Sequence, residues 1–156
     1  MALAAAAGCG AGAFPPSGGP PGLRPQSSPW RTVGLADVAG VGRILVDANG
    51  FTLYLFVPDR RGAPTCHGFC MLEWPPLVVP AGGADPTPGP GVQGSLLATV
   101  PLATGGAQVT YNGWPLYRWV ADAEPGQANG EAVSNFGGLW YAVDASGQAV
   151  KVRTSL

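Results

Sequence analysis

The sequence predicts an all-β fold, a small antiparallel β domain built from two related β-hairpin units. Three observations lead to this prediction. Runs of β-branched and aromatic residues flank Asn-Gly dipeptides, which supply the positive φ angles of tight hairpin turns. No window shows a convincing helical period, and Pro interrupts most of the windows that could be helical. An eleven-residue segment also recurs later in the chain, as a repeat would require.

Composition narrows the class of protein. The chain has 156 residues, of which 25 are Gly and 17 are Pro, and 46% are hydrophobic. This hydrophobic content is too high for a disordered acidic chain. Charged residues make up only 11% and the net charge is −1, so a basic surface for nucleic acid is not expected. No apolar run approaches the roughly 20 residues that a membrane-spanning helix needs.

The first nine residues are a short apolar run that ends in Gly8 and Cys9, as the end of a bacterial lipoprotein signal does. On this interpretation residues 1–9 are a signal remnant and Cys9 is the lipidated residue. Residues 10–29 are mostly Gly, Pro, Ser and Ala, a composition that predicts a disordered tether. The alternative is an unmodified Ala-rich leader followed by an ordinary disordered terminus.

Three hairpins are predicted from turn chemistry between strand-forming runs. They are centred on Asn49-Gly50, Asn112-Gly113 and Ser146-Gly147. One short helical turn is predicted near Cys66–Trp74.

The first two hairpins belong to the internal repeat. Superimposing residues 49–59 on residues 112–122 gives six identities in eleven positions, and two further positions exchange Phe for Trp. The alignment predicts that equivalent residues of the two copies differ by 63 in residue number throughout. It also predicts that a pseudo-twofold axis relates their strands. The predicted boundaries are a single domain over 30–156, with repeat units over about 31–79 and 95–156 and a linker over 80–94.

Each copy of the repeat carries the pattern Tyr-x-(Phe/Trp/Tyr)-x-x-Asp. The pattern residues are Tyr54, Phe56 and Asp59 in the first copy and Tyr117, Trp119 and Asp122 in the second. Together with the stretch from Cys66 to Leu77, these motifs resemble a bacterial secreted or lipoprotein repeat family of unknown function that carries the pattern in tandem. The resemblance covers about residues 31–147. It implies an exported, commonly lipid-anchored domain, and it implies no reaction.

Strand alternation assigns roles to the motif residues. Tyr54 and Phe56 share one face and Leu53 and Leu55 the other, so this strand is expected to be covered on both faces. Arg118 indicates one wetter face for the second copy.

The motif aspartates end their strands and are expected to accept backbone N–H groups of the following turns. A buried Tyr hydroxyl needs a partner, and the aspartate of the other repeat could serve for Tyr54 and Tyr117. The alternative is a ligand groove lined by Tyr and Trp.

Cys66 and Cys70 are predicted to form a disulfide, because their spacing on a helical turn brings the Cα atoms within bridging distance. An exported protein permits this oxidation. One alternative is a copper-binding or thiol-redox module that uses Cys66, His67, Cys70 and Met71, since soft sulfur ligands with an imidazole suit copper(I). The other alternative is that both cysteines are free thiols.

No catalytic role is predicted. His67 is the only histidine and has no acid beside it, and the chain lacks a nucleophile elbow, a phosphate loop and a dinucleotide fingerprint. A small carbohydrate-binding or hydrolytic domain using Asp59 and Asp122 remains an alternative.

The leading interpretation is a non-catalytic lipoprotein domain of the bacterial cell envelope, without a cofactor and with an unidentified protein or small-molecule ligand. It is exported and anchored to the membrane through Cys9. Free secretion is the alternative location.

Overall fold

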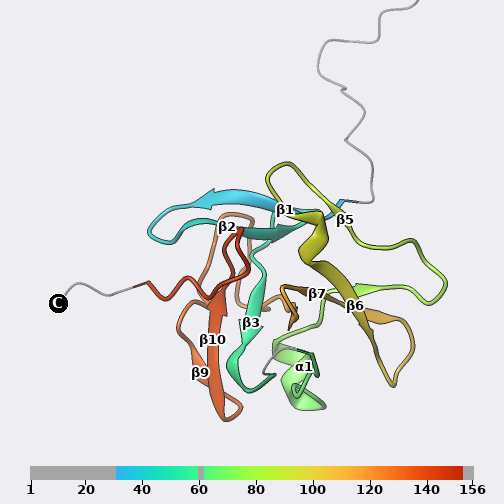
Figure 1. The fold of residues 1–156 in the computed structure, drawn as a ribbon. Helices are drawn as coiled ribbons and strands as arrows, with labels where there is room; N and C mark the ends of the chain where they lie inside the picture. The colour runs from blue at the N-terminus through green and yellow to red at the C-terminus, as the bar shows by residue number, and fades with distance from the viewer. Residues whose placement is uncertain (1–30, 60–61, 153–156) are drawn as a thin grey trace, which may run out of the picture.

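The computed structural model describes residues 31–59 and 62–152 (Figure 1). The predicted lipidation site Cys9 and the predicted tether over residues 10–29 lie outside the described residues. None of the described helices is both long enough and apolar enough to cross a membrane.

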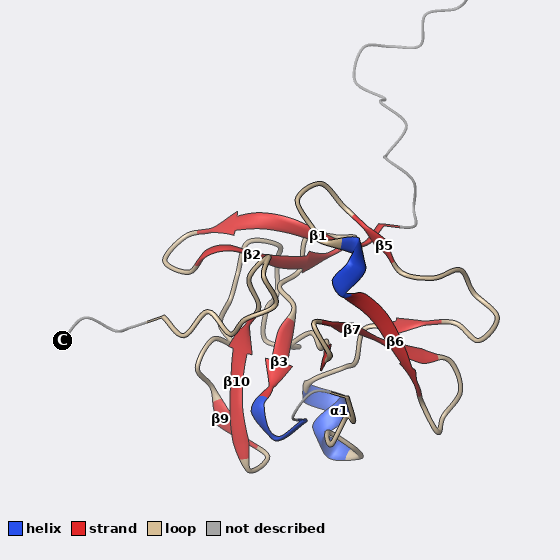
Figure 2. Cartoon of the chain, in the orientation of Figure 1, coloured by secondary structure: helices blue, strands red, loops and turns tan. Residues whose placement is uncertain are grey.

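Strands make up most of the regular secondary structure of the described residues, and the helices are short (Figure 2). The elements of the first half are β1 (Arg31–Val38), β2 (Gly42–Asp47), β3 (Tyr54–Phe56), the 3-10 turn η1 (Val57–Asp59), α1 (Phe69–Glu73), β4 (Val78–Val79) and β5 (Thr87–Pro88). Those of the second half are the 3-10 turn η2 (Gly94–Leu96), β6 (Leu97–Pro101), β7 (Ala107–Tyr111), β8 (Trp114–Pro115), β9 (Ser134–Asn135) and β10 (Gly138–Ala142).

Three small sheets contain these strands. Their orders are β2-β1-β5, β3-β10-β9 and β4-β7-β6, and β8 also pairs with β7. Apart from the parallel pair of β1 and β5, every ladder between these strands is antiparallel. The predicted all-β antiparallel fold is therefore confirmed, and α1 lies where a helical turn was expected.

All three predicted hairpin turns are present. Val46 pairs with Thr52 around the first and Val143 with Ala149 around the third. The second is a two-residue loop closed by Tyr111 and Trp114. Asn112 and Gly113 there have φ angles of 51° and 80°, the left-handed pair that such a loop requires.

The prediction of one constant offset between the copies is wrong on one side of these turns. Leu53 N–H donates to Leu45 O, whereas Leu116 N–H donates to Val109 O, so the offset is 63 after the turn and 64 before it. The first loop holds one residue more, with Gly50 at φ 90°. Three-residue and two-residue hairpin loops share the Asn-Gly signature, which hid the shift.

With this shift the strand neighbours of the two repeats correspond. In the first repeat, Val33 of β1 pairs with Asp47 and Leu35 with Leu45 of β2. Adding 64 to each of these residue numbers gives the equivalent residues of β6 and β7, and these residues are also paired.

The two repeats exchange their last strands. Leu77 follows Trp74 in the first repeat, yet its N–H donates to Leu116 O and its carbonyl accepts from Val109 N–H of the second. Conversely β10 pairs with β3, and Leu45 N–H donates to Val143 O. The segments after Trp74 and Trp140 are therefore equivalent, and they align on these two tryptophans. Each repeat completes the sheet of the other, so neither sheet is built from one repeat alone.

A pseudo-twofold axis passes between the two motif strands. Tyr54 N–H donates to Tyr117 O at 2.9 Å, and Tyr117 N–H donates to Tyr54 O at 3.0 Å. Equivalent residues thus pair with each other, as they must where a twofold axis crosses an antiparallel ladder. The predicted relation of the motif strands is confirmed.

Two apolar clusters lie on opposite faces of β3. The aromatic core contains Val38, Ile44, Tyr54, Phe56, Cys66, Cys70, Trp74, Tyr117, Trp140 and Ala142. The aliphatic core contains Val33, Leu45, Leu53, Leu55, Val92, Val109, Tyr111, Leu116 and Val143. The predicted alternation along the first motif strand is confirmed, since its even-numbered residues 54 and 56 enter one core and its odd-numbered residues 53 and 55 the other.

Residues 80–94, identified by composition as a linker, do more than connect the repeats. They include β5, which pairs with β1, and Gly89 N–H donates to Val33 O. Val92 is buried in the aliphatic core.

Candidate functional site

The motif tyrosines and aspartates form two reciprocal hydrogen bonds between the repeats. Tyr54 Oη donates to Asp122 Oδ2 at 2.6 Å, and Tyr117 Oη donates to Asp59 Oδ2 at 2.8 Å. All four side chains are at least 96% buried. The predicted partnership, each tyrosine with the aspartate of the other repeat, is confirmed.

The second oxygen of each aspartate fixes a turn. Asp59 Oδ1 accepts the backbone N–H and the hydroxyl of Thr65, and Asp122 Oδ1 accepts the backbone N–H of Asn129. Burial raises the pKa of both carboxyls above the ordinary aspartate value. The hydrogen bonds lower the pKa, but by less than burial raises it. Both oxygens of each carboxyl are therefore occupied by the protein itself.

Burial, together with the neighbouring aspartate, also raises the pKa of Tyr54 and Tyr117 far above the ordinary value of 10.0. Above about pH 10 the unfolded chain releases the tyrosine protons and the native state keeps them. The free energy of unfolding should then fall by about 1.4 kcal/mol in total for each tyrosine between about pH 9 and pH 11, most steeply at the upper end. Urea titrations between about pH 9 and pH 11 measure this slope. Tyr54→Phe removes the contribution of one of the two tyrosines, so its free energy of unfolding should fall less steeply with pH than that of the wild type. An unchanged slope would contradict the prediction.

The remaining motif residues belong to an aromatic stack that crosses the pseudo-twofold axis. Trp74 and Trp140 stack with ring centroids 3.9 Å apart and planes 3° apart. Phe56 stacks on the outer face of Trp140 at 4.1 Å, and Trp119 on that of Trp74 at 5.1 Å. Tyr54 and Tyr117 contact the tryptophans edge-on. The stack therefore has the same order of equivalent residues from either end.

The predicted disulfide between Cys66 and Cys70 is present, with the Cα atoms 5.3 Å apart. Both cysteines are buried in the aromatic core beside α1. In the chain-entropy treatment a bridge over so short a loop contributes about 2 kcal/mol. Replacing both cysteines with serine should lower the free energy of unfolding by about that amount, as measured by urea denaturation, and reduced wild type should behave alike. A loss below about 0.5 kcal/mol, the range of ordinary surface substitutions, would show that the bridge is not stabilising.

The copper alternative would require this bridge to be reduced. Both cysteines are oxidised, so neither is available as a thiolate ligand without reduction. His67 is exposed and Met71 packs against the aromatic core. Among residues 31–59 and 62–152, no three His, Cys, Asp or Glu side chains are grouped as a metal would need.

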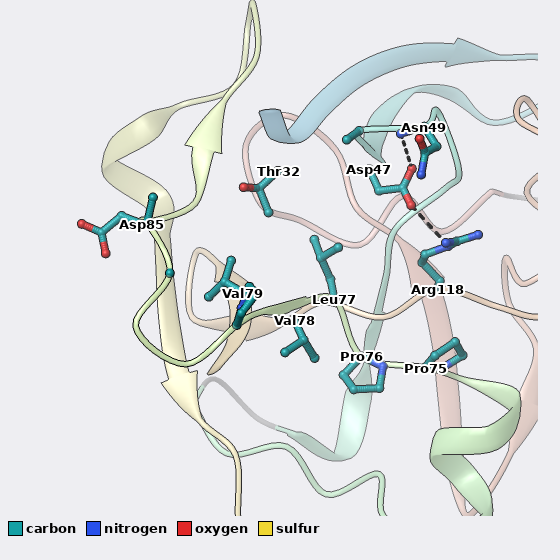
Figure 3. A pocket seen from close by; sticks show the side chains of 14 residues that line it. Thr32, Asp47, Asn49, Pro75, Pro76, Leu77, Val78, Val79, Asp85 and Arg118 are labelled. Atoms are coloured by element: carbon teal, nitrogen blue, oxygen red, sulfur yellow. Dashed lines mark hydrogen bonds and ion pairs between the residues drawn. The ribbon is translucent and has the colours of Figure 1, made fainter. Parts of the chain in front are cut away.

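The described residues form an open cleft of about 750 Å³, the size of a small-molecule site. Figure 3 shows Thr32 of β1 above it and the segment from Pro75 to Val79 below it. Its lining residues are Thr32, Asp47, Ala48, Asn49, Pro75, Pro76, Leu77, Val78, Val79, Pro80, Gly83, Ala84, Asp85 and Arg118. No motif residue of either repeat lines it.

One end of the cleft carries an ion pair whose carboxylate is hydrogen-bonded. Arg118 Nε lies 3.3 Å from Asp47 Oδ2, and the guanidinium lies 4.2 Å from the centre of the Phe51 ring. Asp47 Oδ1 accepts the backbone N–H groups of Asn49 and Phe51, which holds the carboxylate in place. The arginine side chain is 35% exposed, as expected from its position on the wetter face of the second motif strand.

Sequence reasoning did not find this cleft. Arg118 was its only visible signal, as a charged residue on an otherwise apolar strand. Asp47 and the 75–79 segment come together only through the exchange of strands between repeats, which no local pattern encodes. The motif residues, in contrast, were found and belong to the scaffold.

Fold and site together define a class, a tandem-repeat all-β domain whose repeated tyrosines and aspartates join its halves. A family model described as a secreted repeat of unknown function matches residues 37–78 and residues 98–144. These regions make up more than half of the chain, so the chain belongs to this family of secreted repeats, and the protein is exported. Both matches end at equivalent positions, Val78 and Asp144. No curated protein and no solved structure matches the chain.

Proposed function

We propose that the protein is a non-catalytic binding domain of the bacterial cell envelope, exported and anchored to the membrane by a lipid on Cys9. The observation that carries the proposal is the separation between motif and cleft. The motif's polar groups are buried and bonded to one another, so they support the fold. The cleft offers an apolar surface with an ion pair at one end, which suits recognition of a ligand.

The hydrolytic alternative draws less support from the same geometry. It would require Asp59 and Asp122 to face a substrate, with room for water or a sugar ring between them. Each carboxyl instead accepts from a tyrosine and a backbone N–H, and neither lines the cleft. A thiol-redox role would require reduction of a bridge whose two residues are buried.

Anchoring predicts a clear result for Cys9→Ser. When the gene is expressed with any codons that lie upstream, the wild type should sediment with membranes and the variant should be soluble. Stable anchoring needs more than one acyl chain, so the wild-type mass should show multiple acylation at this cysteine. Cys66→Ser, which replaces a disulfide-bonded cysteine elsewhere in the chain, is the control and should stay membrane-bound. A soluble wild type with an unmodified Met1 would overturn the anchor.

A further inference from the structure

We propose that the cleft binds a phenol group that carries no negative charge, either on a free molecule or as a tyrosine side chain. The inference rests on the proposed binding function and names the ligand class. It follows from the pseudo-twofold axis, because the second repeat shows what fills the equivalent space.

The residue equivalent to Asp47 in the second repeat is Tyr111, since the larger offset applies before the turn. Tyr111 is fully buried. Its hydroxyl donates to Ala145 O at 2.6 Å and accepts from Gln93 N–H at 3.0 Å. The phenol ring therefore spans the distance from the end of β7 to the segment that follows β10.

The same path in the first repeat is the cleft. The segment after Trp140 corresponds to the segment after Trp74, and in this alignment Ala145 corresponds to Val79. Both Asp47 and Val79 line the cleft, at the two ends of that path. The aspartate side chain is short and is held in its own turn, so it leaves empty the space that a tyrosine occupies in the other repeat.

Charge decides which phenols fit. The ionisable residues that line the cleft are Asp47, Asp85 and Arg118. The first and the last of these pair with each other, whereas Asp85 lies at the opposite end (Figure 3). The Asp85 carboxylate points away from Thr32 and Val79 in Figure 3 and is exposed, so it acts on a ligand in the cleft through its charge. An anionic ligand would be repelled, and a cationic one attracted. The acceptor for a phenol hydroxyl is the carbonyl of Val79, the equivalent of the Ala145 carbonyl that accepts from Tyr111.

The test is a titration of the isotope-labelled full chain, followed through the backbone amide shifts of Thr32, Leu77 and Val79. The probes are p-cresol, tyramine, 4-hydroxyphenylacetate and p-xylene, which differ in charge or lack the hydroxyl. We expect saturable shifts with a Kd near or below about 1 mM for tyramine and p-cresol. Binding of 4-hydroxyphenylacetate should be about threefold weaker or more, and p-xylene should bind more weakly than p-cresol. N-acetyltyrosinamide distinguishes the sources, because tighter binding than p-cresol indicates a tyrosine of a polypeptide and weaker binding a free phenol.

A matched pair of variants separates cleft binding from surface binding. Ala84 is exposed and lines the cleft, whereas Ala81 is exposed in the same loop and does not line it. Ala84→Trp should abolish the shifts, and Ala81→Trp should leave them unchanged. Absence of saturation with every phenol up to about 10 mM, equal binding of p-xylene, or an unaffected Ala84→Trp would overturn the proposal. None of these outcomes affects the membrane test of Cys9→Ser, so the two proposals fail separately.

Discussion

Replacing Trp140 with alanine is expected to lower the free energy of unfolding by about 3–5 kcal/mol, the range for truncation of a buried large aromatic side chain. Trp140 is fully buried and stacks between Phe56 and Trp74. It also lies in β10, the strand that the second repeat contributes to the first. The free energy of unfolding of a domain is commonly only about 5–15 kcal/mol, so this loss is a large fraction of it. Urea denaturation followed by tryptophan fluorescence or circular dichroism measures the loss.

Two further variants make the result specific. Phe69→Ala removes an aromatic ring that is 82% exposed on α1 and should change stability by less than about 0.5 kcal/mol. Trp140→Phe should lose less than Trp140→Ala, because it keeps a ring in the stack. It also removes a buried indole N–H for which the described residues provide no acceptor. A loss below about 1 kcal/mol in Trp140→Ala would show that the stack does not hold the repeats together.

Replacing Asp122 with alanine is expected to cost about 1–3 kcal/mol, because a buried tyrosine hydroxyl loses its acceptor. The same change removes the acceptor of Asn129 N–H, so the following turn should loosen as well. Asp59→Ala should have the same effect, because it removes the acceptor of the Tyr117 hydroxyl and of the Thr65 N–H. The melting temperature and the urea midpoint of each variant measure the effect.

The matched control for the aspartates is Asp37→Ala. Asp37 makes an ion pair with Arg43, but its side chain is 78% exposed, so its loss should cost less than about 0.5 kcal/mol. Unchanged melting temperatures in both Asp59→Ala and Asp122→Ala would refute the structural role of the motif and revive the ligand groove.

Local chemistry made much of this architecture predictable. Asn112-Gly113 tolerates the two consecutive positive φ angles that a tight hairpin loop requires. Alternation along Tyr54–Phe56 assigned each side chain to a face. The partnership of each tyrosine with the distant aspartate followed from two facts, the internal repeat and the need of a buried hydroxyl for an acceptor. The short spacing of Cys66 and Cys70 similarly limited what these thiols could do.

The remaining features depend on tertiary structure. The one-residue shift before Gly50 depends on which hairpin loop forms, and both loop types accept the same dipeptide. The exchange of the strands after Trp74 and Trp140 pairs segments far apart in sequence, and no periodicity reports it. Asp47 and Tyr111 stand at equivalent positions of the two repeats, a correspondence that is visible only after the shift of register is known.

The central claim is that the motif residues join the two repeats, each tyrosine with the aspartate of the other copy. Double-mutant cycles measure this directly, with Tyr→Phe and Asp→Ala as the single changes. The pairs Tyr54/Asp122 and Tyr117/Asp59 should each show a coupling of about 1–3 kcal/mol. The pairs within one copy, Tyr54/Asp59 and Tyr117/Asp122, should be additive to within about 0.5 kcal/mol. Coupling within the copies and additivity between them would contradict the claim.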